Sequence, residues 1–595
     1  MTDSATGASA HAHGSPSFIE KIRTVQVQTS EPFDAIVIGS GISGGWAAKE
    51  LTEKGLRTLV LERGRNVEHG TDYVTEHRTP WETPFNGRGD RRHTEERQFR
   101  QVKAGPYNEN TAHWYVDDVD HPYETTAEDS SDEFLWVRGH HLGGRSVMWG
   151  RQSYRLSDMD FTANEREGRG TRWPVGYDDI APWYSHVEKF VGITGEKMGL
   201  RQLPDSEFLP PMTMTAVEKH VRQTLADRYA GRPMTIGRSA ILTQPHEGRA
   251  GCHYCGPCDR GCTAGAYFCS LSSTLPAAQA TGRLTVRPDS IVHSLIYDET
   301  TDRVTGVRVI DRQTKEAMEF SARVVFLNAS TLGTAQILLN TKTPRFPNGL
   351  GNQSGLLGKG IMDHHFKCGA TGEIEGYEDR YTFGNRPNGI YIPRFQNLPW
   401  EPASNRDFTR GYGYQGGSGR NGWGRGAAEA GVGVALKESL REPGQWSFLM
   451  LPFGETLAYD DNLIELTDKT DQWGIPIPRV TGSIRENELR MREGMKTDGA
   501  EMLEAAGATN IRQFDDAYRL GEGIHEMGTA RMSATPETGC VDKDNRVHEI
   551  PNLYVTDGAF MTSAGCQNPS LTYMAFTARA ANHAVEALKN GDLRA

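Results

Sequence analysis

A glycine-rich turn between two apolar strands constrains the fold of this 595-residue chain more than any other feature. Residues 35–38 form a short apolar run rich in β-branched side chains, which is typical of a strand buried on both faces. Residues 56–61 predict a second strand, which ends at Glu62. The glycines between them fill the spacing G-x-G-x-x-G and are Gly39, Gly41 and Gly44. The sequence therefore predicts a strand–turn–helix–strand unit over residues 33–64.

This unit has the pattern of a dinucleotide-binding motif. The first glycine allows a sharp turn, the second lets a pyrophosphate approach the backbone, and the third lets the helix pack on the strand. The helix directs its free N–H groups and positive dipole end at the phosphates. Glu62 lies 62 − 39 = 23 residues after Gly39, close to the roughly 20 expected for a carboxylate that binds a ribose 2′-hydroxyl. The acid disfavours NADP and leaves the choice between FAD and NAD open.

Charge and hydropathy exclude some classes of partner. The net charge of −12 and the absence of long Lys/Arg blocks argue against nucleic acid or an anionic membrane as the main partner. No stretch approaches the ~18 consecutive apolar residues of a membrane-spanning helix. Residues 1–30 are small and polar, without an apolar signal region or a twin arginine, and predict a disordered leader. We therefore expect a chain that stays in the cytoplasm or is exported together with a partner.

Four of the eight cysteines fall within eleven residues, at the spacing C-x2-C-x2-C-x3-C. They are Cys252, Cys255, Cys258 and Cys262. The spacing is that of a bacterial ferredoxin loop, although Thr263 stands where proline usually follows. Disulfides between such close cysteines would need uncomfortably short loops. The pattern favours an iron–sulfur cluster, with structural zinc as the alternative. The other cysteines, predicted to be buried small hydrophobic residues, are Cys269, Cys368, Cys540 and Cys566.

The middle of the chain predicts further elements of two kinds. Residues 323–340 repeat the buried strand–turn–helix pattern and return the chain to the nucleotide domain. Residues 366–513 alternate and are rich in aromatic side chains, which predicts a mostly antiparallel sheet. The glycine-rich run 411–426 is interpreted as a flexible surface loop within it. Shorter predicted elements are a helix over 216–229 and the strands of a β-meander over 284–292 and 303–309.

The last 75 residues carry the clearest polar motifs. His525 begins the run His-Glu-Met-Gly-Thr-Ala-Arg-Met, and a short strand over 553–555 leads to Asp557-Gly558. Asn568 and Pro569 predict the start of a helix that ends near residues 590–591, with the asparagine as N-cap and the proline at the first helical position. Without further information, the histidine is interpreted as a core residue and the asparagine as a structural cap.

Taken together, these motifs resemble the glucose–methanol–choline (GMC) flavin oxidoreductases over most of the chain. The resemblance covers the residues 33–64 unit, the loop Gly143-Gly144-Arg-Ser146, the runs 328–333 and 358–363, and the two C-terminal motifs. It implies an α/β plus α+β fold, with a Rossmann-like FAD-binding domain interleaved with an antiparallel-sheet substrate domain. The FAD domain is expected at 31–155, 246–364 (with the cysteine loop 251–263) and 520–595, and the substrate domain at 156–245 and 365–519.

The resemblance also implies the roles of individual residues. The family's catalytic histidine corresponds to His525, and a His or Asn stands at Asn568, with a typical separation of 568 − 525 = 43. The cofactor is FAD, bound non-covalently because Met148 stands where the pyranose oxidases attach the flavin to histidine. The implied cofactor contacts are Gly39, Gly41, Ile42, Ser43, Gly44, Glu62, Arg63, Gly143, Gly144, Ser146, Val292, Ala329, Asp557, Gly558, Asn568 and Pro569.

Within the family, the chain is similar to bacterial sugar and glycoside dehydrogenases, including glucoside 3-dehydrogenases and FAD-dependent glucose dehydrogenases. Their pattern C-x5-C-x3-C, matched by Cys252, Cys258 and Cys262, holds a 3Fe-4S cluster. Cys255 is either a bystander or the fourth ligand of a 4Fe-4S cluster, and the resemblance favours three irons. It also implies electron transfer to a cytochrome c or dye acceptor, and a small subunit with a twin-arginine signal that escorts the chain to the periplasm.

The resulting hypothesis is an FAD-dependent dehydrogenase that oxidises a secondary hydroxyl, at C3, of a sugar or glycoside. His525 takes the hydroxyl proton, Asn568 orients the hydroxyl, and FAD N5 accepts the hydride. Arg151 and Gln152 are candidate contacts to substrate hydroxyls. The alternatives are an oxygen-using pyranose or glycoside oxidase, a GMC dehydrogenase acting on glucose C1, gluconate or sorbitol, and a catalytically silent subunit that keeps FAD for structure.

Overall fold

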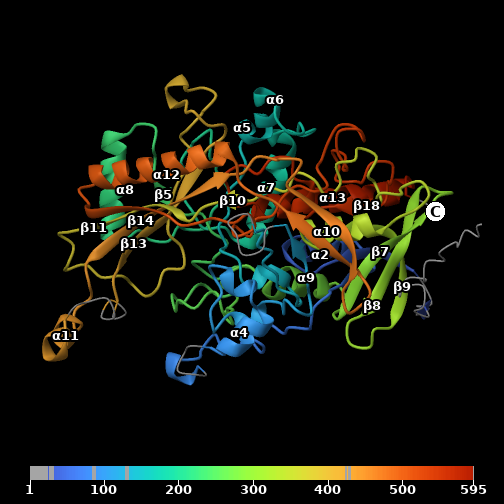
Figure 1. The fold of residues 1–595 in the computed structure, drawn as a ribbon, viewed down its shortest axis with the longest axis horizontal. Helices are drawn as coiled ribbons and strands as arrows, with labels where there is room; N and C mark the ends of the chain where they lie inside the picture. The colour runs from blue at the N-terminus through green and yellow to red at the C-terminus, as the bar shows by residue number, and fades with distance from the viewer. Residues whose placement is uncertain are drawn as a thin grey trace, which may run out of the picture.

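Two large sheets form opposite halves of the molecule (Figure 1), and a third sheet is smaller. The computed structural model describes residues 24–25, 32–83, 89–126, 133–422, 425 and 431–593. Of the predicted leader 1–30, the described residues are Thr24 and Val25, which form β1; the rest of that prediction lies outside the described residues. Among the described residues, no helix combines the length and apolar character needed to cross a bilayer.

The first sheet contains the glycine-rich unit and lies in the right half of Figure 1. Its strand order is β6 (Leu284–Arg287), β3 (Thr58–Leu61), β2 (Phe33–Ile38), β9 (Ala317–Leu327), β8 (Arg303–Asp311) and β7 (Ser290–Asp298). β1 and β18 (Leu553–Val555) also pair with β9. The pairs from β6 to β9 are parallel, whereas β9, β8 and β7 form an antiparallel meander.

The glycine-rich turn packs as its spacing predicts. β2 is almost wholly buried, and α2 (Ile42–Glu53) follows it directly. Gly39 has a φ of +97°, and a Cβ there would overlap the backbone carbonyl of Asn328. A Cβ at Gly44 would overlap the carbonyl of Gly39, whereas one at Gly41 would meet open space. The first and third glycines therefore let backbones pack closely, and the second leaves room above the turn.

The second sheet is antiparallel and lies in the left half of Figure 1. Its strand order is β17 (Thr509–Asp515), β11 (Cys368–Ile374), β14 (Trp446–Glu455), β13 (Tyr412–Arg420), β12 (Ile390–Ile392) and β5 (Thr235–Ile236). β10 (His364–His365) pairs with the end of β14. Helix α12 (Glu486–Ala505) packs on β11 and β14, and α8 (Ala216–Arg228) packs on α12. The predicted antiparallel sheet over 366–513 is confirmed in its main strands.

The interpretation of residues 411–426 as a loop is wrong over residues 412–420, whereas residues 423, 424 and 426 lie outside the described residues. β13 pairs with β14 over its whole length, from Tyr412 to Arg420. Its glycines allow close backbone approach, since a Cβ at Gly416, where φ is +130°, would overlap the carbonyl of Leu449. Glycine in a strand often marks such an approach, and a glycine count alone does not distinguish it from a flexible loop.

The remaining elements connect and cover the sheets. The third sheet consists of β15 (Leu463–Thr470), β16 (Pro476–Thr481) and β4 (Glu124–Thr125). α13 (Ser570–Asn590) packs on α2 and on α7 (Tyr177–Val191). The other helices are α4 (Arg91–Arg97), α5 (Asp158–Phe161), α6 (Ala163–Glu167), α9 (Thr274–Ala280), α10 (Thr331–Asn340) and α11 (Gly433–Ser439).

The shorter predictions have mixed outcomes. The helix predicted over 216–229 is α8, and the repeat at 323–340 is the end of β9 followed by α10, so both are confirmed. The single strand predicted over 284–292 is wrong, because Pro288 and Asp289 separate β6 from β7. The division into two domains at the stated residues stays a prediction.

Replacing Gly39 with alanine tests the close packing of the turn. We expect Gly39→Ala to lower the free energy of unfolding by more than about 3 kcal/mol, from φ strain plus backbone overlap, and to reduce flavin content. Gly55→Ala is the matched control, since φ there is +98° but its Cβ meets nothing within 4 Å; strain alone should cost about 1 kcal/mol. Denaturant unfolding and flavin absorbance measure both effects, and equal losses in the two variants would contradict the packing argument.

Candidate active site

A cavity of about 530 Å³ opens where the parallel strands of the first sheet end. The turns after β2, β3, β9 and β18 all contribute to it, because the carboxyl ends of parallel strands meet at one edge of a sheet. The loop at η4 (Gly144–Val147) and the start of α13 complete its wall. Segments from both ends of the chain therefore share one cavity.

Most of the site residues predicted from the sequence line this cavity. They are Gly39, Gly41, Ile42, Ser43, Glu62, Arg63, Gly144, Ser146, Arg151, Gln152, Val292, Ala329, His525, Asp557, Gly558, Asn568 and Pro569. Gly44 and Gly143 lie behind the lining: Gly44 packs against the carbonyl of Gly39, and the Gly143 N–H donates to Ser40 Oγ at 2.9 Å. These two glycines shape the wall rather than face the cavity.

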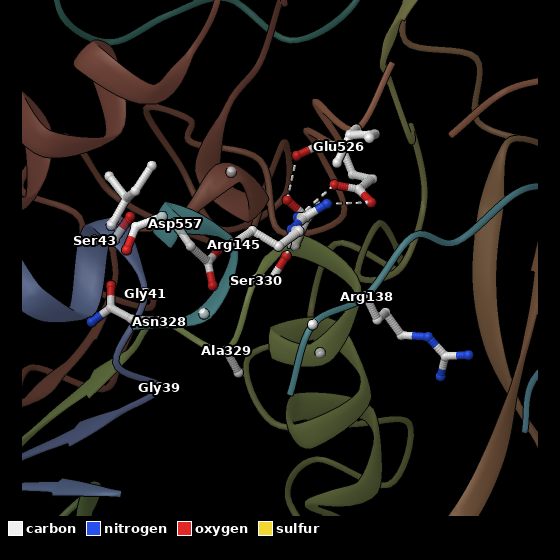
Figure 2. Close-up of a pocket in the computed structure, with 18 of the residues that line it drawn as sticks. Gly39, Gly41, Ser43, Arg138, Arg145, Asn328, Ala329, Ser330, Glu526 and Asp557 are labelled. Carbon is white, nitrogen blue, oxygen red and sulfur yellow. Dashed lines mark hydrogen bonds and ion pairs between the residues drawn. The ribbon is translucent and has the colours of Figure 1, made fainter. Parts of the chain in front are cut away.

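The phosphate-binding features expected of this wall are present. Helix α2 begins after Gly41 without a side-chain cap, so the N–H groups of its first turn are free for a ligand. The Asn328 Nδ2 group is buried and has no hydrogen-bond partner among the described residues, and Asn328 lines the cavity. Figure 2 shows Gly39, Gly41, Ser43 and Asn328 on neighbouring turns at this wall. A dinucleotide fits this donor set.

Glu62 lies at the end of β3 and lines the cavity, as its spacing predicts. Its Oε2 accepts hydrogen bonds from the Ser40 N–H at 3.1 Å and from Ser40 Oγ at 2.5 Å, and its Oε1 accepts one from the Gly64 N–H at 2.8 Å. Burial raises the pKa of this carboxyl above its ordinary value, while the three donors act in the opposite direction. The carboxylate is thereby held in one orientation at the cavity edge.

His525 and Asn568 meet at the cavity. Asn568 Nδ2 lies 3.4 Å from His525 Nε2, and both residues line the wall. The interpretation of Asn568 as an N-cap is wrong, because α13 begins at Ser570 and the residue before it, Pro569, stands at the cap position. The carboxamide instead bonds His525 and Gln415, whose Nε2 donates to Asn568 Oδ1 at 2.7 Å. An imidazole and a carboxamide in this position can bind one hydroxyl between them.

A second histidine, His364 of β10, lies behind the first. Its Nδ1 is 2.9 Å from His525 Nδ1, and its Nε2 is 2.8 Å from the carbonyl oxygen of Gly565. Both imidazoles are neutral at ordinary pH: burial lowers the pKa of His364 to about 4, and burial, followed by His364 and Arg145, lowers that of His525 well below 6.5. A neutral imidazole retains a lone pair that can accept a proton.

Asp363 holds these elements together. Its buried carboxylate accepts hydrogen bonds from the backbone N–H groups of His364, Gly521, Gly523 and His525 and from the Tyr518 hydroxyl, at 2.8–3.0 Å. Burial, with Glu526 as the second cause, raises its pKa to about 7. The carboxylate fixes the loop that carries His525 against β10.

Arg145 and Glu526 form a pair that the sequence did not reveal. The guanidinium donates to both carboxylate oxygens, at 3.0 and 2.7 Å, and also to Ser330 Oγ at 2.8 Å (Figure 2). Both residues line the cavity beside His525. Arg145 stands within the predicted glycine loop and Glu526 follows His525, but no local pattern pairs positions so far apart in the chain.

The two candidate substrate contacts also line the cavity, but each has a partner of its own. Arg151 donates through Nη1 to the carbonyl oxygen of Cys258 at 3.1 Å, and its guanidinium carbon lies 4.8 Å from the centre of the Tyr267 ring. Gln152 bonds Asn388 at 3.3 Å through Nε2. Arg151 thus lies between this cavity and the cysteine loop, and the role of both residues toward a substrate stays a prediction.

All four clustered cysteines line a second cavity of about 340 Å³, which adjoins Tyr267. Each is a free thiol, and the Tyr254 N–H points at Cys252 Sγ at 3.4 Å. In the part of the chain that the structure describes, no three His, Cys, Asp or Glu side chains are grouped closely enough to hold a single metal ion. The other four cysteines are buried, as predicted.

Comparison with known protein families shows which family this chain belongs to. The N-terminal model of the GMC oxidoreductases matches residues 33–366, and the C-terminal model matches residues 458–577. The chain belongs to the GMC oxidoreductase family. The family membership confirms the predicted GMC fold and FAD as the cofactor, and the chain is an FAD-dependent oxidoreductase that acts on alcohol groups.

Several curated GMC enzymes are similar over nearly the whole chain. The 2-methyl-1,2-propanediol dehydrogenase of Mycolicibacterium austroafricanum is 27% identical, covering 93% of this chain and 95% of its own. The 6'''-hydroxyparomomycin C oxidase of Streptomyces lividus is 26% identical, covering 92% and 90%. The fructose dehydrogenase large subunit of Gluconobacter japonicus is 23% identical, covering 94% and 98%.

Solved structures share the fold of this GMC enzyme. A pyridoxine 4-oxidase from Mesorbium loti aligns with a TM-score of 0.56 at 15% identity, covering 92% of this chain and 98% of its own. A formate oxidase of Aspergillus oryzae RIB40, in a structure that concerns modification of its FAD, aligns with a TM-score of 0.57 at 15% identity, covering 94% and 99%. At this identity the likeness supports the fold alone.

The Arg145–Glu526 pair generates a stability prediction. Glu526→Gln removes a buried carboxylate from a guanidinium that is only partly buried, and we expect a loss of about 2 kcal/mol in the free energy of unfolding, because two charge-assisted hydrogen bonds are weakened. Glu486→Gln is the control, since Glu486 and its partner Arg490 are both exposed; little change is expected there. Urea unfolding of the FAD-loaded proteins measures both, and equal losses would contradict a structural role for the Arg145–Glu526 pair.

Proposed function

We propose that this GMC enzyme is a dehydrogenase that oxidises a secondary hydroxyl, at C3, of a sugar or glycoside. The observation that carries the proposal is the meeting of His525 and Asn568, 3.4 Å apart, at the wall of the cavity with the dinucleotide-binding features. A basic nitrogen and a carboxamide donor at one point suit a single substrate hydroxyl.

Each residue has a separate role in the proposed reaction. His525, neutral at ordinary pH, accepts the hydroxyl proton, while an Asn568 N–H donates to the same oxygen and stabilises the negative charge that develops on it. The Arg145 guanidinium, kept charged by Glu526, contributes positive potential beside the pair. FAD, when bound, supplies the acceptor for the hydride that leaves the carbon.

Relatives support a polyhydroxylated substrate. Fructose dehydrogenase and a gluconate 2-dehydrogenase flavoprotein, 23% and 22% identical, are named for a sugar and a sugar acid, both of which carry several hydroxyls. Two Streptomyces enzymes, each 26% identical, are named for oxidation of paromomycin-type compounds. Arg151 and Gln152, both at the cavity, are proposed to bind neighbouring substrate hydroxyls.

We further propose that the cysteine loop holds an iron–sulfur cluster through Cys252, Cys258 and Cys262, as a 3Fe-4S centre, with Cys255 as the fourth ligand if the centre is 4Fe-4S. Four free thiols around one cavity support this, since a cluster keeps its ligands apart by its own width and needs no preformed single-ion site. The cluster would supply one-electron transfer away from the flavin site. Arg151 lines the first cavity and donates a hydrogen bond to the carbonyl of Cys258 at the second, so it lies between the two.

An iron–sulfur route implies a protein acceptor. We propose a cytochrome c as acceptor and a small partner subunit that carries the export signal to the periplasm. The fructose dehydrogenase relative supports a partner, because its name describes it as a large subunit.

Substitution of His525 tests the proposed reaction. Mixed anaerobically with methyl glucosides and glucose, the FAD-loaded protein should lose its oxidised-flavin absorbance. We expect His525→Ala to slow this by about 10²–10⁴-fold, the usual contribution of a general base, with FAD content unchanged. His220→Ala is the control, because His220 lies on α8 and bonds the Ala506 carbonyl. Unchanged reduction in His525→Ala would contradict the proposal.

The same experiment separates the alternatives. Fast reoxidation by oxygen, with hydrogen peroxide formed as fast as substrate disappears, would select an oxidase. Reduction by glucose, gluconate or sorbitol but not by glycosides would select another sugar dehydrogenase. If no alcohol reduces the flavin, the remaining alternative, a catalytically silent subunit, would be selected.

The cysteine loop generates a metal prediction. Protein purified without oxygen should contain iron and acid-labile sulfide, and Cys258→Ser should lose both, together with electron transfer to cytochrome c, while keeping flavin reduction. Cys269→Ser is the control, since Cys269 is buried outside the spacing motif. Iron-free wild-type protein, or stoichiometric zinc, would contradict the cluster.

A further inference from the structure

A hydrogen-bond chain passes through the two proposed reacting groups and ends beyond each of them. In order, its members are Gln415, Asn568, His525, His364 and the carbonyl of Gly565. Gln415 lies on β13, His525 in the loop after β17 and His364 on β10, while Asn568 and Gly565 both lie in the segment before α13. The chain therefore joins the second sheet to the wall of the cavity.

Chemistry fixes the direction of the chain at the Gly565 end. A carbonyl oxygen can only accept, so His364 carries its proton on Nε2. Because His364 is neutral, its Nδ1 is an acceptor. The 2.9 Å contact between the two Nδ1 atoms then requires His525 to donate from its own Nδ1. Since His525 is also neutral, its Nε2 bears a lone pair.

The Gln415 end has the same direction in the structure. Gln415 Nε2 donates to Asn568 Oδ1 at 2.7 Å, which leaves Asn568 Nδ2 to face His525 Nε2. With Gln415 in this orientation, a reversed Asn568 carboxamide would place an oxygen against the histidine lone pair and an amino group against the Gln415 amino group. The two ends agree, so every bond in the chain runs from Gln415 toward Gly565.

We propose that His364 and Gln415 are positioning residues that hold this chain in one direction, so that a lone pair of His525 and an N–H of Asn568 face the substrate hydroxyl. The proposal rests on the proposed function, in which His525 is the base. The reversed chain would present an imidazole N–H and an amide oxygen. An amide oxygen is too weak a base to take the hydroxyl proton, so the direction decides whether the site reacts.

Paired substitutions of similar size distinguish an effect on the direction of the hydrogen-bond chain from an effect on side-chain packing. His364→Asn keeps an acceptor near the Nδ1 position, whereas His364→Leu has nearly the same shape and no acceptor. Gln415→Glu can only accept and would turn the Asn568 carboxamide, whereas Gln415→Met fills similar space without imposing either orientation. Each variant is measured by anaerobic flavin reduction over a range of methyl glucoside concentrations, which gives a limiting rate and a substrate dissociation constant separately.

We expect His364→Leu and Gln415→Glu to lower the limiting rate at least about tenfold, because a misassigned tautomer or amide disables a general base. The dissociation constant should change less than about twofold. His364→Asn and Gln415→Met should stay within about threefold of the wild type. Equal rates in His364→Asn and His364→Leu, or an unaffected Gln415→Glu, would overturn the proposal.

Two controls keep the outcomes distinct. FAD content and thermal unfolding show whether each variant folds, and if His364→Leu does not, the Gln415 pair on the sheet surface decides the question. If His525→Ala reduces flavin as fast as the wild type, the proposed function fails. If His525→Ala is slow but the paired substitutions do not differ, the function stands and the directional chain fails.

Discussion

Five hydrogen-bond donors converge on one buried carboxylate, that of Asp363, and the geometry of the site depends on this convergence. A carboxylate without water is costly unless its oxygens are satisfied. Here backbone N–H groups from residues 521–525 satisfy it, together with the neighbouring His364 N–H and the Tyr518 hydroxyl. Because these donors must stay bonded to Asp363, the loop that carries His525 packs against β10. This packing places His525 Nδ1 2.9 Å from His364 Nδ1.

Three segments far apart in the chain then complete the site. Asn568 arrives with the start of α13, which packs on α2 of the nucleotide unit. Gln415 arrives from β13 of the second sheet, and the Arg145–Glu526 pair ties the η4 loop to the residue after His525. The proposed reacting groups therefore contact segments of both sheets, and a substrate bound beside them would meet both halves of the molecule.

Features encoded by neighbouring residues could be predicted from the sequence, and features encoded by distant ones could not. The turn from Gly39 to Gly44, Glu62 at the end of β3 and the helix ending at Gly591 follow from local spacing, and the structure has them. Asn568 before Pro569 has the local pattern of a cap, but tertiary hydrogen bonds take its side chain.

The other features that the sequence did not predict also depend on residues far apart in the chain. The glycines of β13 predict a loop when taken alone, because the need for small residues there depends on the close approach of the facing strand, β14. His364 and Gln415 carry no motif that the sequence reading used, and their relation to His525 appears only when β10, β13 and the loop are placed together. Family resemblance supplied the proposed catalytic pair, whereas the structure supplied the groups that contact it.

The central claim is that His525 stands neutral at the cavity with its Nε2 lone pair unprotonated. Neutron diffraction from a deuterium-exchanged crystal at neutral pH measures this directly. The account predicts deuterium on Nδ1 of His525 and on Nε2 of His364, and none on Nε2 of His525. Deuterium on Nε2 of His525, whether from the other tautomer or from a charged ring, would contradict it.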